Sequence, residues 1–327
     1  MAEKTMVEAV RDAMSEEMKR DERVILMGED VEGGGVFRAS EGLLGEFGPE
    51  RCLNTPLAEA AIIGAAIGAS LNGILPIAEM QFADFSHPAF DQIVSEAARM
   101  HYRSNGTWNV PIVIRAPYGA GIHGGPYHSQ SIEAFYAHVP GLRVVCVANA
   151  YDAKGLLKSA IRDPNPVMFL EHKKAYRLSR EEIPDEDYTV PIGQAAVKRE
   201  GDDITLVTYG LMTHHSLSAA ETVEGEDGLS VEVIDLRTVA PWDKKTVLAS
   251  VEKTGKALIV YEDNLTGGFG AEVAATIAQD GFDFLDGPVT RVASPDVPLA
   301  PFAGPLEEYL LPTPEKIAAA IRDLAAY

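Results

Sequence analysis

NTPLAEAAIIGAAIGASLNG, residues 54–73, places one acidic side chain, Glu59, at the head of a run of small and apolar residues. Thr55 as a cap and Pro56 at the first position predict that a helix begins here. Glycine costs about 1 kcal/mol relative to alanine inside a helix, so Gly64 and Gly68 indicate a face that another backbone approaches closely. The stretch therefore predicts a tightly packed helix with a carboxylate at its start.

The pattern alone supports two interpretations of Glu59. A carboxylate in the first turn commonly does no more than complement the positive end of the helix dipole. Alternatively, the small apolar surroundings exclude water from the carboxylate, which would then share a proton with a nitrogen of a bound ligand. The spacing of the residues does not separate these two roles.

Short β-rich runs alternate with helical patterns along the whole chain, which is typical of parallel sheets covered by helices. With 327 residues, 46% of them hydrophobic, the chain is long enough to form two cores. The charged stretch 173–193 contains two prolines and no helical stripe, as is typical of a linker between domains. We expect a first domain over residues 1–180, a linker over 181–192 and a second α/β domain over 193–327.

The same patterns predict the individual elements. We expect strands at 23–30, 74–82, 110–117, 142–149 and 166–173, and, in the second domain, at 203–210, 230–237, 256–263 and 288–294. We expect helices in the N-terminal region through Met18, at 151–163, 213–224, 243–254 and 269–280, and from Thr313 to the C-terminus.

Composition excludes several classes of protein. A net charge of -21 argues against a nucleic-acid-binding surface, which needs Lys and Arg to neutralise phosphates. The strong acidity suits a soluble protein, and adaptation to high salt is one hypothesis for it. No apolar run reaches the roughly 20 residues of a membrane span, and the N-terminus lacks the apolar core of a signal peptide. We therefore expect a soluble, cytoplasmic protein whose two cysteines, Cys52 and Cys146, are buried core thiols.

A glycine-rich loop with two histidines, RAPYGAGIHGGPYHSQS (115–131), follows a predicted strand. Loops at the carboxyl ends of strands are where α/β sheets bind ligands, and histidine exchanges protons near neutral pH. His123 and His128 are therefore candidate proton donors or acceptors, and a hydrogen-bonded structural role is the alternative for each. No third ligand accompanies them, which argues against a metal site.

Three other turn-forming segments have simpler interpretations. VEGGGVF (31–37) lacks the glycine spacing of a dinucleotide-binding loop. TGGFGAEV (266–273) is explained by a glycine turn that leads into a helix. DPNP (163–166) closes a helix and is explained by a turn in which Asp and Asn make local hydrogen bonds.

Seven blocks, in order along the chain, resemble the β subunit of the E1 component of 2-oxo acid dehydrogenase complexes. They are LMGEDV, NTPLAEAAIIGAAIG, AEMQFADF, FDQIVSEAAR, YHSQSIEAFYAH, YDAKGLLKSAIRD and VIDLRTVAPWD. The resemblance implies a thiamine-diphosphate-binding, transketolase-like pyrimidine domain with a parallel sheet, followed by a transketolase C-terminal-type α/β domain. It also implies oxidative decarboxylation of a 2-oxo acid and acyl transfer to the lipoyl group of the E2 acyltransferase.

The resemblance assigns roles to residues of these blocks. Glu59 matches the glutamate that contacts N1′ of the cofactor's aminopyrimidine ring, and Leu57, Gln81 and Phe85 match its neighbours. Glu59 would favour the imino form of that ring, whose 4′-nitrogen then removes the weakly acidic C2 proton. Other members have tyrosine where Phe85 stands, so a phenol hydrogen bond is absent here. His128 matches the histidine that faces the substrate and assists decarboxylation or acyl transfer.

The resemblance also implies metal ions and a partner chain. A structural K+ would bind oxygen atoms of Ile112, Ala160, Ile161, Asp163 and Asn165, and oxygen-only ligation suits such a hard cation. The sequence lacks the G-D-G block and the later paired asparagines with which this superfamily holds Mg2+ and the diphosphate. We therefore expect an α chain to hold Mg2+ and to complete the cofactor site across an interface, in an α2β2 heterotetramer.

Several alternatives to this function stay open. AEMQFADF and YHSQS favour a branched-chain 2-oxo acid, with pyruvate next. Acetoin dehydrogenase and a transketolase-type half-chain are alternative enzymes. A non-catalytic assembly subunit that binds E2 is an alternative of another class, against which the presence of Glu59 and His128 argues. A nicotinamide dehydrogenase is disfavoured because the glycine fingerprint for its cofactor is missing.

Overall fold

The chain divides into two compact units in the computed structural model, which describes residues 2–298 and 300–327. Unit 1 comprises Met1–Tyr118 and Phe135–Ile192, and unit 2 comprises Gly119–Ala134 and Gly193–Tyr327. One division therefore lies between residues 192 and 193. In addition, the glycine-rich segment with both histidines groups with unit 2, although it lies between two strands of unit 1 in the sequence.

The strands of unit 1 form a parallel sheet in the order β6-β7-β5-β4-β2-β3. They are β2 (Val24–Gly28), β3 (Cys52–Asn54), β4 (Leu75–Glu79), β5 (Val113–Tyr118), β6 (Arg143–Val147) and β7 (Val167–His172). The five strands that the sequence predicts in this unit are confirmed. Of this sheet, the short β3 was not predicted, nor were the two short strands β1 (Ala2–Lys4) and β8 (Glu181–Ile183) that pair with each other elsewhere in unit 1. Cys52 and Cys146 are buried free thiols on this sheet, as expected.

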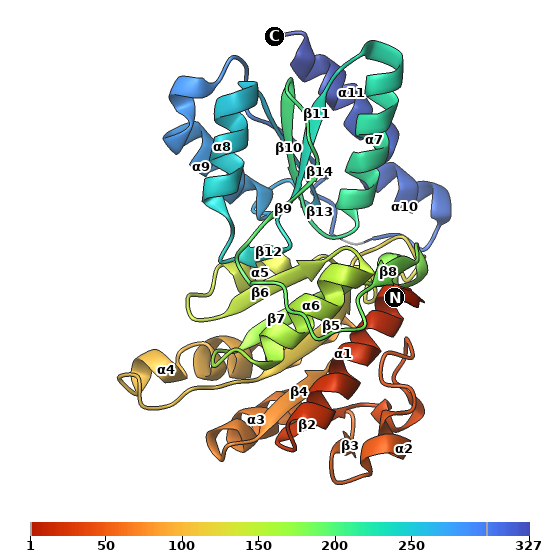
Figure 1. Cartoon of the computed structure of the whole chain (residues 1–327), viewed down its shortest axis with the longest axis vertical. Coiled ribbons are helices and arrows are strands. Elements are labelled where there is room, and N and C mark those ends of the chain that lie inside the picture. The colour runs from red at the N-terminus through yellow and green to blue at the C-terminus, as the bar shows by residue number, and fades with distance from the viewer. Residues whose placement is uncertain (1, 299) are drawn as a thin grey trace. The chain divides into compact units, whose positions relative to one another are not determined.

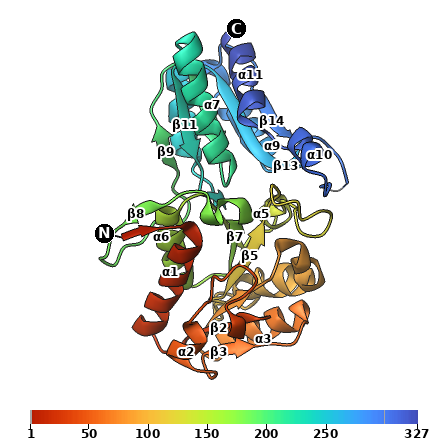
Figure 2. The same ribbon diagram turned by 90° about the vertical axis from the view of Figure 1, so that its right-hand side faces the viewer.

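Helices cover the sheet of unit 1, and Figure 2 shows α1 and α3 on opposite sides of β2. On one face, α1 (Met6–Arg20) packs against α6 (Ala150–Ile161). A reciprocal capping box of Thr5 and Glu8 opens α1. On the other face, α3 (Glu59–Leu71) packs against η2 (Ala83–Ala89) and η3 (Gln92–Ala97). The shorter elements are β1 (Ala2–Lys4), η1 (Val31–Gly33), α2 (Leu43–Phe47), α4 (Met100–Arg103), α5 (Glu133–Ala137), η4 (Lys173–Arg177) and β8 (Glu181–Ile183).

The predicted start of α3 is wrong, because the helix begins at Glu59 and Thr55 does not cap it. The N–H of Thr55 instead donates to the carbonyl of Gly28 at 2.9 Å, which continues the pairing of β3 with β2. Ala58 is the residue before the helix, and no side chain caps it. Glu59 consequently occupies the first helical position itself.

The sheet of unit 2 has the order β14-β13-β10-β11-β9, in which only the edge strand β9 is antiparallel. Figure 1 shows α7 and α11 on one face of this sheet and α8 and α9 on the other. The helices and strands of unit 2 are β9 (Ala196–Arg199), β10 (Ile204–Thr208), α7 (Met212–Asp227), β11 (Val231–Asp235), β12 (Thr238–Ala240), α8 (Lys244–Thr254), β13 (Ala257–Asn264), α9 (Gly270–Asp280), η5 (Phe282–Phe284), β14 (Thr290–Ser294), α10 (Gly304–Leu310) and α11 (Pro314–Ala325).

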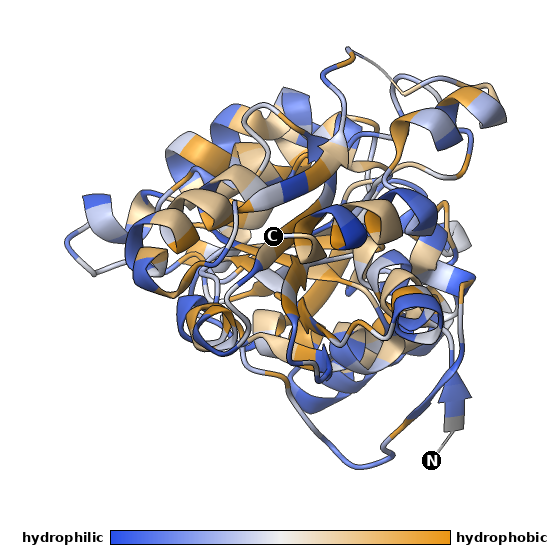
Figure 3. Ribbon diagram, turned by 90° about the horizontal axis from the view of Figure 1, so that it is seen from above, coloured by the Kyte–Doolittle hydropathy of each residue, from blue (hydrophilic) through white to orange (hydrophobic). Residues whose placement is uncertain are grey.

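The sequence predicts most of unit 2 correctly. All four expected strands and all four expected helices are present, and the hydroxyl of Thr313 caps α11 by accepting from the N–H of Lys316. The short β9, β12 and α10 were not predicted. Figure 3 shows that the strands are mainly hydrophobic, whereas the helices combine hydrophobic and hydrophilic residues. Across the described residues, no helix is both long enough and apolar enough to cross a membrane.

Candidate active site

The predicted cofactor contacts gather at one edge of the unit 1 sheet. Because β2 is parallel to both of its neighbours, β3 and β4, the segments that follow these three strands leave from the same edge. Glu29 follows β2, Leu57 follows β3 and Gln81 follows β4. Glu59 begins α3, which packs against the short helix η2 that contains Phe85. The four predicted residues therefore lie on segments at this edge of the sheet, and Glu29 lies there as well.

Glu59 and Glu29 form a pair of buried carboxyl groups. They are 9% and 5% exposed. Burial and then the charge of Glu59 raise the pKa of the Glu29 carboxyl, and a hydrogen bond from the N–H of Ala58 opposes that rise. Glu29 was not predicted as a site residue, although it stands within LMGEDV. An acidic residue directly after a buried strand was the signal that could have identified it.

Two polar atoms near this pair have unmet hydrogen-bonding capacity. Glu29 Oε1 and Thr55 Oγ1 are buried without a hydrogen-bond partner among the described residues. Leaving such a group unpaired costs about 1–3 kcal/mol. A bound polar ligand would remove that cost, so these atoms mark the carboxyl edge of β2 and β3 as a place that suits one.

Aromatic rings and one amide border the same edge. Gln81 Nε2 donates to Asp30 Oδ2 at 2.7 Å, so the side chain of Gln81 is held next to the Glu29 segment. The ring of Phe85 meets Phe82 edge-on, with 5.6 Å between the centroids. Lys173 Nζ lies 5.6 Å from the centroid of Phe82. This edge thus carries aromatic rings together with a few oriented polar groups, a combination that ligand sites commonly use.

A buried ion cluster fixes three strands just below this edge. Arg115 on β5 donates to both oxygens of Glu171 on β7, from Nε and Nη2 at 2.7 Å each, and from Nη1 to Glu79 on β4 at 2.5 Å. The Tyr176 hydroxyl donates to Glu171 at 2.6 Å. Although burial works against it, the charges of Glu171 and Glu79 raise the pKa of Arg115, so the guanidinium stays charged. The cluster was not predicted, and it holds the ends of the strands rigidly.

The small-residue face of α3 is exposed in this chain. Ala61, Gly64, Ala65 and Gly68 all lie on the surface. Within the described chain, a Cβ added to Gly64 or Gly68 would meet no atom within 4 Å. The close packing that the two glycines predict is therefore not made inside unit 1.

Both predicted histidines lie in Gly119–Ala134 of unit 2, a segment that we name the histidine loop. His128 is half-buried, and a Cβ added to Gly124 would lie only 2.9 Å from the Cβ of His128. His123 is exposed, and its Nδ1 lies 2.7 Å from Glu307 Oε2. The structure thus gives His123 a carboxylate partner that the sequence did not indicate.

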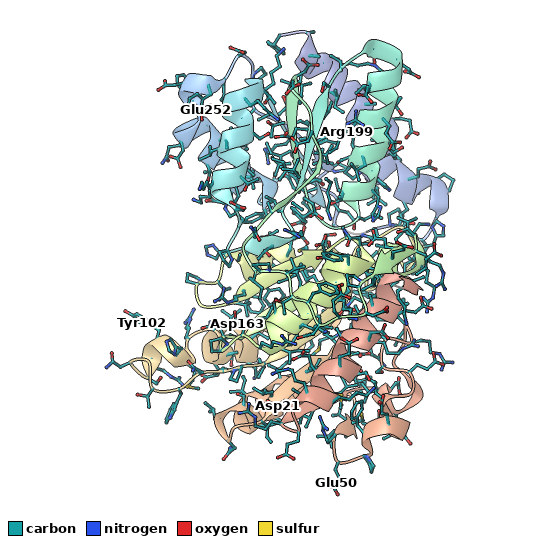
Figure 4. All side chains as sticks on the ribbon, in the orientation of Figure 1. Asp21, Glu50, Tyr102, Asp163, Arg199 and Glu252 are labelled. Atoms are coloured by element: carbon teal, nitrogen blue, oxygen red, sulfur yellow. The ribbon has the colours of Figure 1, made fainter. Side chains whose placement is uncertain are left out.

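The residues of the predicted K+ site lie toward the opposite edge of the unit 1 sheet. Asp163, labelled in Figure 4, follows α6, and its Oδ1 accepts from the N–H and Nδ2 of Asn165 at 2.8 Å each. The DPNP turn is therefore confirmed. The carbonyl of Ala160 accepts from Asp163 N, and that of Ile112 accepts from Val167 N. Arg143 Nε lies 2.9 Å from Asp163 Oδ2. In the part of the chain that the structure describes, no three His, Cys, Asp or Glu side chains group to hold a metal ion.

Two family models match the chain. The model "Transketolase, pyrimidine binding domain" matches residues 2–179, and "Transketolase, C-terminal domain" matches residues 193–317. Among curated proteins, 2-oxoisovalerate dehydrogenase subunit beta of Bacillus subtilis (strain 168) is 54% identical over 328 residues, which cover 100% of both chains. Pyruvate dehydrogenase E1 component subunit beta of the same strain is 51% identical over 297 residues, which cover 90% of this chain and 91% of that protein.

Solved structures show the same fold. A split-gene transketolase, described as an inactive β4 tetramer, has a TM-score of 0.78 at 25% identity and covers 99% of each chain. A transketolase from Leishmania mexicana has a TM-score of 0.70 at 16% identity, and the match covers 100% of this chain and 46% of that one. The second similarity concerns the fold alone.

Proposed function

The chain belongs to the family of E1 β subunits of 2-oxo acid dehydrogenases, and from this premise we propose that it works with an α chain to decarboxylate a 2-oxo acid and acylate the lipoyl group of E2. The buried Glu59 at the first position of α3, paired with the buried Glu29, carries this proposal. We propose a branched-chain 2-oxo acid as the substrate. The 54% identity over the full length of the 2-oxoisovalerate subunit, against 51% for the pyruvate subunit, supports that choice.

The residues at the carboxyl edge of β2, β3 and β4 fit the aminopyrimidine part of thiamine diphosphate. When bound, this cofactor supplies the nucleophilic carbon that attacks the 2-oxo group. Glu59 would hold a proton toward a ring nitrogen, and its burial strengthens that hydrogen bond because water does not compete. Phe85 would offer an aromatic face, and Leu57 and Gln81 would border the ring. The unpaired Glu29 Oε1 and Thr55 Oγ1 supply further acceptors.

His128 would assist either decarboxylation or acyl transfer. An imidazole can both donate and accept a proton, so His128 can hold or move a proton while carbon dioxide leaves or while the acyl group passes to the lipoyl sulfur.

We further propose that an α chain completes the site in an α2β2 heterotetramer and holds Mg2+ with the diphosphate. The exposed small-residue face of α3 supports this, since glycine and alanine allow another backbone to approach closely. Leu57, which is 77% exposed, stands beside that helix and would be covered by the same contact. The split-gene transketolase whose β4 tetramer is described as inactive offers a parallel.

A structural K+ at the Asp163 turn is the remaining part of the proposal. The carbonyls of Ile112 and Ala160 and the carboxylate of Asp163 are hard oxygen donors of the kind that an alkali cation prefers. Arg143 already compensates part of the Asp163 charge. The ion would brace the end of α6 against the start of β5 and would take no part in the chemistry.

Turnover by the reconstituted pair tests the proposed function. The chain is co-expressed with its α partner, and thiamine-diphosphate-dependent decarboxylation is measured with 2-oxoisovalerate, pyruvate and 2-oxoglutarate, with a lipoyl domain as the acyl acceptor. We expect the highest kcat/KM with 2-oxoisovalerate and acylation of the lipoyl domain. Transfer to an aldose without lipoyl acylation would identify a transketolase-type half-chain. Assembly with E2 but no turnover of any substrate would identify a non-catalytic subunit.

A further inference from the structure

Glu307 is a buried carboxylate that binds the middle of the histidine loop. It lies on α10 of unit 2 and is only 2% exposed. Its Oε1 accepts from the N–H of Gly121 at 2.8 Å, and its Oε2 accepts from the N–H of His123 at 3.3 Å. The ring of His123 adds a third contact, with Nδ1 2.7 Å from Oε2. All of the polar contacts described for this carboxylate are therefore to the loop.

These contacts hold the loop in a conformation that it would not adopt freely. Gly121 and His123 have positive φ angles of 85° and 59°. A residue with a side chain pays roughly 1–2 kcal/mol in this left-handed region, so His123 needs compensation from its surroundings. Glu307 supplies it by accepting the amide of His123 and facing its ring. In return, these groups satisfy a carboxylate that would otherwise be buried without partners.

The strained segment is in direct contact with His128. Gly124 follows His123, and a Cβ added there would lie 2.9 Å from the Cβ of His128 and 3.0 Å from its carbonyl oxygen. The next residue, Gly125, has a φ of 69°, and a Cβ added to it would lie 2.3 Å from the ring of Phe302, just before α10. Residues 121–125 thus lie between the α10 region on one side and His128 on the other. We therefore expect a shift of this segment to displace His128.

The ends of the loop are fixed separately. Glu262, at the end of β13, accepts from Ala120 N at 2.7 Å and from Ser131 Oγ at 2.9 Å. Glu133 accepts from the Tyr209 hydroxyl at 2.9 Å. Losing Glu307 should therefore loosen residues 121–125 without detaching the loop, which makes its effect on His128 measurable.

We propose that Glu307 is a positioning residue for His128, and that it acts through His123 and Gly124. The inference rests on the proposed function, because it takes His128 as the group that faces the substrate. It gives His123 a definite role as the partner of Glu307. His123 itself is exposed and, in this role, need not meet the substrate.

Glu307→Gln tests the first half of this proposal in the full chain. One side of the glutamine amide carries N–H groups, so the variant cannot accept all three contacts from the loop. Hydrogen–deuterium exchange of peptides over residues 119–131 should become at least about tenfold faster. Glu308→Gln, on the exposed side of the same helix, is the matched control and should exchange like the wild type. Unchanged exchange in Glu307→Gln would overturn the proposal.

A double-variant cycle tests whether the effect passes through His128. In the pair with α, Glu307→Gln should lower kcat about tenfold and leave the affinity for thiamine diphosphate unchanged. The rate of His128→Asn is measured in single turnovers with enzyme in excess. Adding Glu307→Gln to His128→Asn should not lower this rate further. Losses that multiply would show an independent role and overturn the proposal. If the wild-type chain with its α partner turned over no 2-oxo acid, the proposed function would be rejected. The exchange data would still test whether Glu307 holds the histidine loop.

Discussion

The carboxyl groups of Glu29 and Glu59 share one buried electrostatic environment. Burial and the charge of Glu59 together raise the pKa of Glu29. The two acids come from different elements, since Glu29 follows β2 and Glu59 begins α3. Their proximity arises because the segments after β2 and β3 leave from the same edge of a parallel sheet. The charge of Glu59 therefore influences the protonation of Glu29.

We predict that Glu29→Gln stabilises the protein near neutral pH. The folded state holds the proton of Glu29 more tightly than the unfolded chain, in which this carboxyl titrates near 4.5. Stability due to Glu29 is therefore lost as the pH rises above that value, because the unfolded state then releases its proton more readily. Glutamine cannot ionise and still accepts from Ala58.

Thermal unfolding from about pH 4 to pH 8 measures this effect. The melting temperature of Glu29→Gln should exceed that of the wild type at neutral pH, and the difference should disappear in acid. Glu32→Gln, at an exposed neighbour, should follow the wild type at every pH. A constant offset for Glu29→Gln across the range would contradict the assigned cause.

We predict that Arg115→Met destabilises the protein by about 3–5 kcal/mol, because it leaves Glu79 and Glu171 as unpaired charges in the interior. Arg115→Lys should recover only part of this, since one ammonium group cannot reproduce the two parallel bonds to Glu171. Urea unfolding monitored by circular dichroism gives the free energies. Arg23→Met, which removes an ion pair with Asp21 at the surface, is the control and should cost far less, because water screens this pair. If Arg115→Met and Arg23→Met lowered the free energy of unfolding by similar amounts, the buried ion cluster would not be a main source of stability.

Most of the fold could be predicted from the sequence because apolar runs and helical periodicity reflect burial directly. The strands that were missed, β1, β3, β8, β9 and β12, are three or four residues long, too short for a pattern. The start of α3 was misplaced because Thr55–Pro56 has the composition of a helix start. In the structure, Thr55 instead pairs with Gly28, a partner distant in sequence.

The sequence points to a candidate site residue only where a single segment contains the recognisable pattern. Glu59 and His128 stand in distinctive local blocks, whereas Glu29 and Glu307 matter through partners elsewhere in the chain. Glu307 accepts hydrogen bonds from Gly121 and His123, which are 186 and 184 positions earlier in the chain. Such contacts follow from how the strands and loops assemble, and no local spacing encodes them. The grouping of the histidine loop with unit 2 was missed for the same reason.

We predict that Gly124→Ala lowers turnover about tenfold while the protein stays folded, since misplacing a catalytic group by about 1 Å can cost up to a hundredfold. The added methyl group would meet His128 and Ser129 Oγ at 3.0 Å or less, so the loop must shift. Gly225→Ala on α7 is the control, because a Cβ there meets nothing within 4 Å and should leave activity intact. Steady-state kinetics of the pair with α give the comparison. Equal activity of both variants would show that His128 tolerates the displacement.

We predict that K+ stabilises the chain more than Na+ at equal concentration. An ion that binds only the folded state raises its stability by about 2.7 kcal/mol at a hundred times its Kd. Asp163→Asn should abolish the difference between the two salts. Asp21→Asn should keep it, because Asp21 pairs with Arg23 and supplies no proposed ligand. Melting curves in KCl and NaCl measure the effect, and identical curves for the wild type would remove the K+ site from the account.

Decarboxylation by Glu59→Gln, assembled with the α chain, tests the catalytic role of the buried carboxylate most directly. Glu50→Gln, at an exposed acid of the same unit that Figure 4 labels, is the matched control. The account predicts normal assembly of both variants, wild-type turnover in Glu50→Gln and a loss of about a hundredfold or more in Glu59→Gln. Turnover of Glu59→Gln within twofold of the wild type would contradict it.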